Sequence, residues 1–249
     1  MPNLWKAKEM SIILKDMLNL SYMRSIILSL LCIVIQGCNS QKKDLSKITF
    51  TEKYDTFFGD IPNEYREGSS LIDYNLYDVY HTESEILLNF NGVDLSGYRD
   101  KKGEFGTNYV SFEFSKKDKT LACYHIALFY NKNINKLIEA IKSKIGKPVY
   151  VPSPFEGDTL PDAFLWEDKT SFYTLSGVTQ NQANFIVFKK NDLTVRNQML
   201  SAGNFQYYGD YLYHLEKNNL QKNVFSYKNF VDYNTKEGND FYIDDYRKP

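Results

Sequence analysis

The sequence predicts an α+β fold in which an antiparallel sheet carries one main amphipathic helix on one face. An apolar stripe at helical spacing marks the helix at about residues 133–145. Segments with strand patterns lie on both sides of it, and a one-sided stripe can be buried against such a sheet. We expect this α+β domain to occupy residues 49–200.

The helix is the best-defined predicted element. The residues of its stripe are Ile134, Leu137, Ile138, Ile141 and Ile145. Asn131 or Asn133 is expected to cap the first turn, because asparagine side chains accept hydrogen bonds from free backbone amides. Gly146 suits the left-handed turn that ends a helix, and Pro148 prevents its continuation.

Three strand segments are predicted before the helix. Residues 110–115 alternate apolar and polar side chains, which predicts a half-buried strand. Residues 120–130 are apolar on both faces, so we expect them at the centre of the sheet. Residues 85–90 are predicted to form a further strand that ends at Asn91 and Gly92.

Three more strands are predicted after the helix, at residues 163–167, 171–175 and 184–190. The short gap between the first two predicts a hairpin. Residues 151–162 contain three prolines and are predicted to form a loop. Trp166 has apolar neighbours in its strand, and we expect it to point inward as an anchor for the helix.

The C-terminal segment, residues 201–249, is rich in aromatic residues and is expected to pack on the domain. Residues 205–215 fit one more strand or helix. Beyond Lys217 the aromatic residues mix with polar ones, which predicts irregular chain packed along the body. This part of the chain is too aromatic for free disorder.

The N-terminal part has a different pattern. Residues 26–35 form a ten-residue apolar run broken only by Ser29. Arg24 precedes this run, and Gly37 and Cys38 follow it. The run is about half as long as the ~20 residues of a membrane-spanning helix, and it matches the ~7–15 residue apolar region of a secretory signal. A buried helix or strand that ends at a free cysteine is the alternative.

Residues 23–38 resemble the signal of a bacterial lipoprotein, with Ile-Gln-Gly-Cys at residues 35–38 in the place of its lipobox. The resemblance implies that residues 23–37 are a signal peptide and that Cys38 carries palmitate-type acyl chains. The polar residues 38–48 then form the lipid anchor and a short tether to the membrane.

The same resemblance implies a place in the bacterial cell envelope, facing the periplasm or the cell surface. An aspartate directly after the lipidated cysteine retains some lipoproteins in the inner membrane. Asn39 stands at that position, which favours the outer membrane. Residues 1–22 are then a disordered extension or a misassigned start, with translation beginning at Met23.

The charge balance argues against a nucleic-acid partner. Residues 1–37 hold four of the 30 basic and two of the 31 acidic residues, which leaves 26 basic and 29 acidic residues and a formal net charge of −3. A nucleic-acid binder needs a basic field. Cys123 is the one cysteine after Cys38, so no internal disulfide framework is available. We interpret the many Tyr and Phe residues as sheet packing, with an exposed sugar-stacking surface as the alternative.

Two sets of residues are candidates for chemistry. His81, Glu83 and Glu85 alternate along the chain, and on one strand face they would offer ligands to a metal; an exposed polar strand start is the favoured interpretation. Cys123 and His125 also share a strand face and would make a thiolate nucleophile, but their apolar neighbours favour a buried cysteine that acts as a small hydrophobe.

Acidic residues gather after the predicted helix. They are Glu156, Asp158, Asp162, Glu167 and Asp168. Their oxygens would suit calcium, but the spacing is not that of an EF-hand, and a solvated loop is favoured. Glu167 and Asp168 are adjacent on a predicted strand and point to opposite faces, which argues against a glycoside-hydrolysing pair.

We therefore expect a lipid-anchored binding or accessory module with no metal, no cofactor and no evident catalytic residues. Its partners would be the membrane, through lipid on Cys38, and an envelope protein or glycan. An envelope hydrolase acting on sugars or peptides is one alternative, and an immunity or inhibitor protein is the other.

Overall fold

The structure is a computed structural model that describes residues 42–59, 66–67, 70–152, 161–179 and 181–239. The signal-like segment, Cys38, Glu156 and Asp158 lie outside the described residues. In the part of the chain that is described, no helix combines the length and the apolar character needed to cross a membrane.

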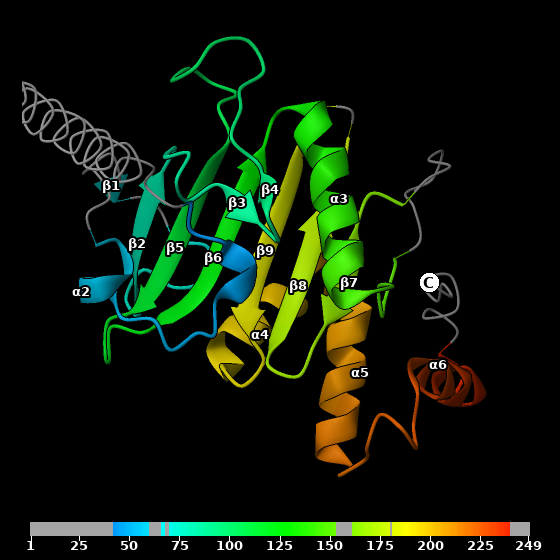
Figure 1. Cartoon of the computed structure of the whole chain (residues 1–249). Helices are drawn as coiled ribbons and strands as arrows, with labels where there is room; N and C mark the ends of the chain where they lie inside the picture. Colours follow the sequence, from blue (N-terminus) through cyan, green and yellow to red (C-terminus); the bar gives the residue numbers. More distant parts are fainter. Residues whose placement is uncertain (1–41, 60–65, 68–69, 153–160, 180, 240–249) are drawn as a thin grey trace, which may run out of the picture. The chain divides into compact units, whose positions relative to one another are not determined.

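A seven-stranded sheet in which every pair of neighbours is antiparallel forms the centre of the domain (Figure 1). Its strands, in spatial order, are β1 (Arg66–Glu67), β2 (Tyr77–Thr82), β5 (Tyr109–Ser115), β6 (Leu121–Leu128), β9 (Ala183–Lys189), β8 (Ser171–Ser176) and β7 (Phe164–Glu167). A separate hairpin joins β3 (Asn89–Phe90) to β4 (Val93–Asp94). The predicted α+β class, the central place of β6 and the β7–β8 hairpin are confirmed.

The predicted helix is α3 (Asn131–Ile145), and it packs on one face of the sheet (Figure 1). Ile134, Leu137 and Ile141 are at most 2% exposed and lie in one cluster with inward residues of the central strands. Trp166 is 1% exposed, and its indole Nε1 donates to the Gly146 carbonyl at 3.1 Å. The prediction that Trp166 anchors this helix is confirmed.

The predicted cap of α3 is wrong. Tyr130 occupies the N-cap position and makes no side-chain capping hydrogen bond. Asn133 instead donates through Nδ2 to the carbonyls of Leu95 (2.9 Å) and Ser96 (2.7 Å). The amide therefore joins the first turn of the helix to the chain that leaves β4.

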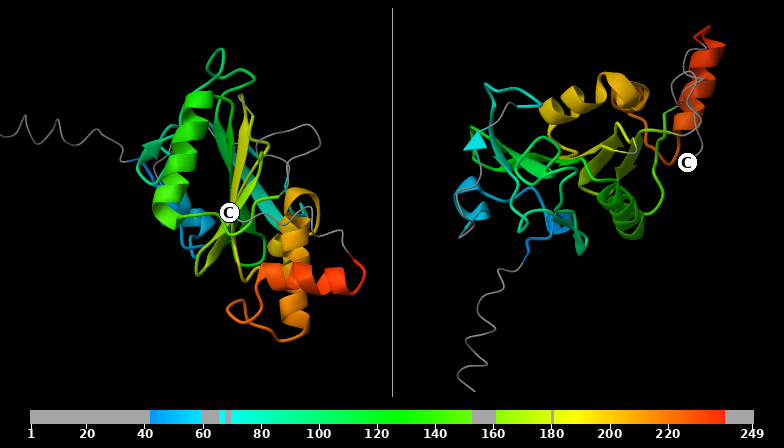
Figure 2. Two further views of the ribbon diagram at one scale, coloured as in Figure 1. Left: turned by 90° about the vertical axis from the view of Figure 1, so that its right-hand side faces the viewer. Right: turned by 90° about the horizontal axis from the view of Figure 1, so that it is seen from above.

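The helices α4 (Leu193–Leu200) and α5 (Gln206–Lys217) pack on the opposite face of the sheet, and α6 (Tyr227–Lys236) packs against α5. Seen from above, α3 and α4 lie on opposite sides of the strands (Figure 2). Irregular chain beyond Lys217 is therefore a wrong prediction, because Ser226 and Asn229 form a reciprocal capping box that begins α6. Short one-turn helices, η2 (Leu45–Lys47), α2 (Tyr54–Phe57) and η3 (Gly203–Phe205), complete the described elements.

The strand predicted at residues 85–90 is also largely wrong. Only Asn89 and Phe90 are in a strand, because Leu87 N donates to the Ser84 carbonyl at 3.0 Å and closes a turn. Leu87 is fully buried within that turn, so its apolar character reflects the core and not a strand face. β5 pairs with β6 on one side and with β2 on the other, and the sequence analysis did not predict a strand over the range of β2.

Glu113 departs from the half-buried pattern expected for residues 110–115. It is only 2% exposed, because the chain at residues 70–72 covers it. Ser70 Oγ donates to its carboxylate at 2.6 Å and Leu71 N donates at 3.0 Å. Burial raises the pKa of Glu113, and these hydrogen bonds oppose that shift.

Candidate binding site

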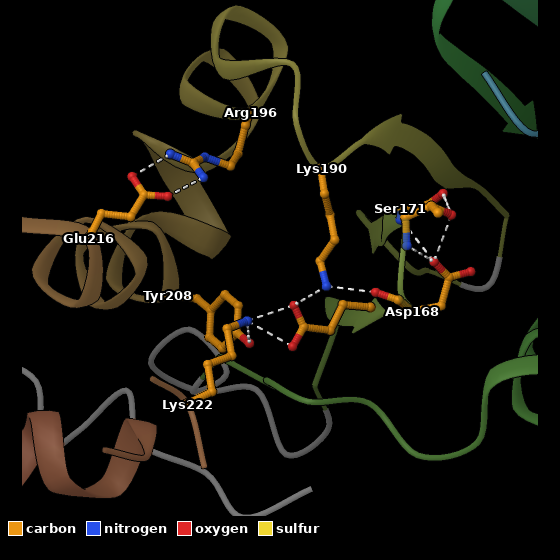
Figure 3. Close-up of polar contacts among 9 residues, drawn as sticks. Asp168, Ser171, Lys190, Arg196, Tyr208, Glu216 and Lys222 are labelled. Atoms are coloured by element: carbon orange, nitrogen blue, oxygen red, sulfur yellow. Dashed lines mark hydrogen bonds and ion pairs between the residues drawn. The ribbon is translucent and has the colours of Figure 1, made fainter. Parts of the chain in front are cut away.

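Three cationic side chains from separate parts of the chain meet at one cavity of about 270 Å³. They are Lys190, Arg196 and Lys222, and we call the cavity the cationic pocket (Figure 3). Glu216 and Phe172 also line it. The remaining lining residues are Asn191, Leu212, Leu215 and Leu220.

The fold explains how distant residues reach this pocket. Lys190 directly follows β9, where its backbone amide donates to the Thr170 carbonyl at 2.9 Å. Arg196 lies in α4, and the carboxylate of Asp192, the N-cap residue, accepts a hydrogen bond from Val195 N. Lys222 lies in the connection between α5 and α6. The pocket therefore forms only when α4 and α5 pack on the end of the sheet that contains β7, β8 and β9.

Glu167, at the end of β7, holds two of the cations. Lys222 Nζ lies 2.7 and 2.6 Å from its two carboxylate oxygens, and Lys190 Nζ lies 3.0 Å from one of them. Burial disfavours ionisation of Glu167, but Lys222 first and then Lys190 hold the pKa of this carboxyl below its usual value. Glu167 is therefore a carboxylate at neutral pH.

The ammonium groups have further contacts. Lys222 donates to the Tyr208 hydroxyl at 3.1 Å, and Lys190 donates to the Asp168 carbonyl at 2.6 Å. Lys190 Nζ also lies 5.0 Å from the centroid of the Phe172 ring, within the range of a cation–π contact. Burial lowers the pKa of Lys222, and its pairing with Glu167 opposes this.

Arg196 and Glu216 form the outer wall of the pocket. The guanidinium donates two parallel hydrogen bonds, of 2.5 and 2.8 Å, to the two carboxylate oxygens. This bidentate pair joins α4 to α5. The Arg196 side chain is 15% exposed and that of Glu216 is 52% exposed, so the carboxylate is the more accessible partner.

The alternative in which His81, Glu83 and Glu85 would hold a metal finds no support in their placement. His81 lies in β2, whereas Glu83 and Glu85 come after that strand has ended, and Glu85 pairs with Lys102 at 2.9 Å. Among the described residues, no group of three or more His, Cys, Asp or Glu side chains is placed to hold a metal ion.

Cys123 and His125 share a face of β6, but their surroundings differ. Cys123 is fully buried, and burial raises the pKa of its thiol well above the usual value, so it behaves as the small hydrophobe favoured from sequence. His125 Nε2 lies 3.1 Å from the Asn184 side-chain oxygen. The sheet register places His81 and His125 on either side of Ser111, and their ring centroids lie 4.2 and 5.9 Å from that of Tyr109.

The acidic residues near the predicted loop have separate partners. Glu167 binds the two lysines, whereas Asp168 accepts hydrogen bonds from Ser171 N at 2.8 Å and from the Tyr173 hydroxyl at 2.6 Å. Asp168 therefore stabilises the β7–β8 turn. Lys190, Arg196 and Lys222 carried no sequence signal, because isolated basic residues usually lie on a solvated surface.

No family model matches this chain, and no curated protein or solved structure matches it.

The half-buried side chain of His125 predicts a pH dependence of stability. Burial is the largest cause that lowers the pKa of His125, and the hydrogen bond with Asn184 opposes it. As pH falls below about 6.5, unfolded His125 binds a proton while folded His125 stays neutral. The unfolded state then binds more protons, so the free energy of unfolding is expected to fall by up to ~1.4 kcal/mol per pH unit until the lowered pKa is reached.

Urea unfolding at about pH 7 and about pH 5.5, on either side of the unfolded histidine pKa, measures this effect. His125→Gln removes the titrating group, so its stability should fall less between the two pH values than that of the wild type. Equal losses in both proteins would contradict the prediction.

Proposed function

We propose that this chain is a lipid-anchored binding module of the bacterial cell envelope. Acyl chains on Cys38 hold it at a membrane, with the outer membrane favoured, and the domain receives a ligand in the cationic pocket. The lipoprotein-type pattern of residues 23–38 supports the anchor. The convergence of Lys190, Arg196 and Lys222 on one cavity is the observation that carries the binding role.

The ion pairs of the pocket favour binding over glycoside hydrolysis. Such hydrolysis uses one carboxyl group as a protonated general acid and a second as a base or nucleophile. Glu167 is kept ionised by two ammonium groups, and Glu216 is bound by Arg196. The ionised Glu167 is not suited to donate a proton, so this carboxylate gives no support to the hydrolase alternative.

The anchor is tested by replacing Cys38 with serine. The variant is expected to lose labelling by radioactive palmitate and to leave the membrane fraction, because each buried methylene of an acyl chain contributes ~0.8 kcal/mol to membrane binding. Cys123→Ala is the matched control: it removes a buried cysteine and should keep both the label and the membrane fractionation. Membrane attachment of an unlabelled Cys38→Ser protein would contradict a lipid anchor.

The pocket is tested by filling it. Leu220 lines the cavity, so Leu220→Trp is expected to exclude a ligand. The full chain in detergent is heated with and without the low-molecular-weight fraction of an envelope extract, since a ligand that binds the folded state raises Tm. Wild type and the control Val224→Trp, whose residue is 75% exposed, should both be stabilised.

Leu220→Trp should show no such rise in Tm. An equal rise in all three proteins would place the ligand outside the cationic pocket. The absence of any rise, with the extract concentrated about tenfold, would contradict a diffusible ligand.

A further inference from the structure

We infer that the cationic pocket binds a small oxyanion, a carboxylate or a phosphate group, between Lys190 and Arg196. This inference rests on the proposed function only in treating the cavity as a ligand site. It assigns the chemical class of the ligand and the two side chains that contact it.

The charge of the pocket favours an anion. Three cations line the cavity, but Glu216 is the one carboxylate among its lining residues. Glu167 pairs with Lys190 and Lys222 without lining the cavity. The five side chains together keep one formal positive charge in excess, and apolar walls strengthen its attraction for an anion by limiting access of water.

The hydrogen-bond donors show which cations remain able to bind. An ammonium group has three donors, and those of Lys222 are matched by the two oxygens of Glu167 and the Tyr208 hydroxyl. Lys190 uses two of its three, toward Glu167 and the Asp168 carbonyl. Lys222 thus acts as a positioning residue that fixes Glu167.

Arg196 has the largest reserve of donors. Its guanidinium carries five N–H groups. Within the described residues it donates two hydrogen bonds, both to Glu216. The spare donors of Arg196 and the third donor of Lys190 belong to the same cavity. A planar guanidinium next to an ammonium group is well suited to carboxylate and phosphate oxygens.

The carboxylate of Glu216 occupies the position beside Arg196 that an oxyanion ligand would take. Its carboxylate already occupies the fork of Arg196, yet its side chain is 52% exposed and can turn into solvent. An incoming oxyanion therefore competes with Glu216 for Arg196. Removing the charge of Glu216 should strengthen binding, a gain that partial unfolding cannot imitate.

The cavity also limits the size of the ligand. Its volume of about 270 Å³ is slightly below the ~300–1,000 Å³ of pockets for drug-sized molecules. Phe172, Leu212 and Leu215 provide apolar walls. A small ring or short chain that bears one oxyanion fits this combination of volume and lining.

The experiment titrates the full chain in detergent with inorganic phosphate and, separately, with benzoate, using isothermal calorimetry. Lys190→Met and Arg196→Met should each weaken binding by about tenfold or more, because a hydrogen bond to a charged group is lost. Lys228→Met is the control of equal charge: its side chain is 61% exposed and pairs with Asp232 on α6.

Glu216→Gln should bind the same anion several-fold more tightly. Glu139→Gln, which removes an equally charged group 73% exposed on α3, should leave the affinity unchanged. The anion that responds to these variants identifies the carboxylate or the phosphate as the ligand group.

Three outcomes would overturn the inference: no binding of either anion, equal weakening by Lys190→Met and Lys228→Met, or no gain from Glu216→Gln. If Leu220→Trp still abolishes stabilisation by the envelope extract, the proposed function stands and only the oxyanion is refuted. If Leu220→Trp has no effect while Lys190→Met and Arg196→Met weaken phosphate binding, the oxyanion site stands and the proposed function fails.

Discussion

Replacing Gly209 with alanine is expected to destabilise the protein by at least about 2 kcal/mol. Gly209 lies in α5, where the helix crosses the end of α4. A Cβ atom at this position would lie 1.9 Å from the Leu200 carbonyl oxygen and 2.9 Å from its carbon, so the two backbones must separate. The gain in helix propensity, about 1 kcal/mol, does not offset such overpacking.

Chemical unfolding of the two proteins measures the difference in the free energy of unfolding. Gly103→Ala is the matched control: Gly103 has a φ of +80° and no atom within 4 Å of the added Cβ, so only the ~1–2 kcal/mol of backbone strain is expected. A Gly209→Ala protein as stable as the wild type would contradict the close approach of α4 and α5. The same separation would pull Arg196 away from Glu216 and open the cationic pocket.

Trp166→Ala is expected to lower the free energy of unfolding by about 3–5 kcal/mol, the range found when a large aromatic residue is removed from a core. Trp166 is 1% exposed and bonds to the residue that ends α3, so its loss leaves a cavity between the helix and β7. The measurement is again urea unfolding followed by circular dichroism.

Two variants separate the causes of this loss. Trp166→Phe keeps most of the apolar contact but removes the hydrogen bond to Gly146, which is worth about 1 kcal/mol, so its loss should be smaller than that of Trp166→Ala. Phe105→Ala deletes an aromatic side chain that is 79% exposed and should change stability by less than about 0.5 kcal/mol. A Trp166→Ala effect as small as that of Phe105→Ala would contradict the anchoring role.

The sequence predicted those elements whose pattern is local. The stripe over residues 133–145 defined α3, and the doubly apolar residues 120–130 defined the central strand. By contrast, β2 mixes Asp78 and His81 with aromatic residues and is ordered by pairing with β5. The helix α6 was missed because its buried residues, Tyr227, Phe230 and Val231, make a short stripe that is meaningful only beside α5.

The candidate pocket was not predictable from sequence. Lys190, Arg196 and Lys222 belong to a turn, a helix and a connecting segment, and none has a neighbour in sequence that indicates a site. Their meeting depends on how α4 and α5 pack on the sheet. The burial of Cys123 and Trp166, in contrast, was predicted because their apolar neighbours lie beside them in the chain.

The two outer strands of the sheet bear on how the protein behaves when crowded. Within the described residues β1 spans two positions, and the outer side of β7 is met by Val149 and Tyr150, whose backbone groups exchange hydrogen bonds with Leu165. Sheet edges that are short or covered by other parts of the chain resist pairing with the edge strands of another copy. Where copies of this chain meet at high local concentration, such edges are expected to disfavour growth into fibres.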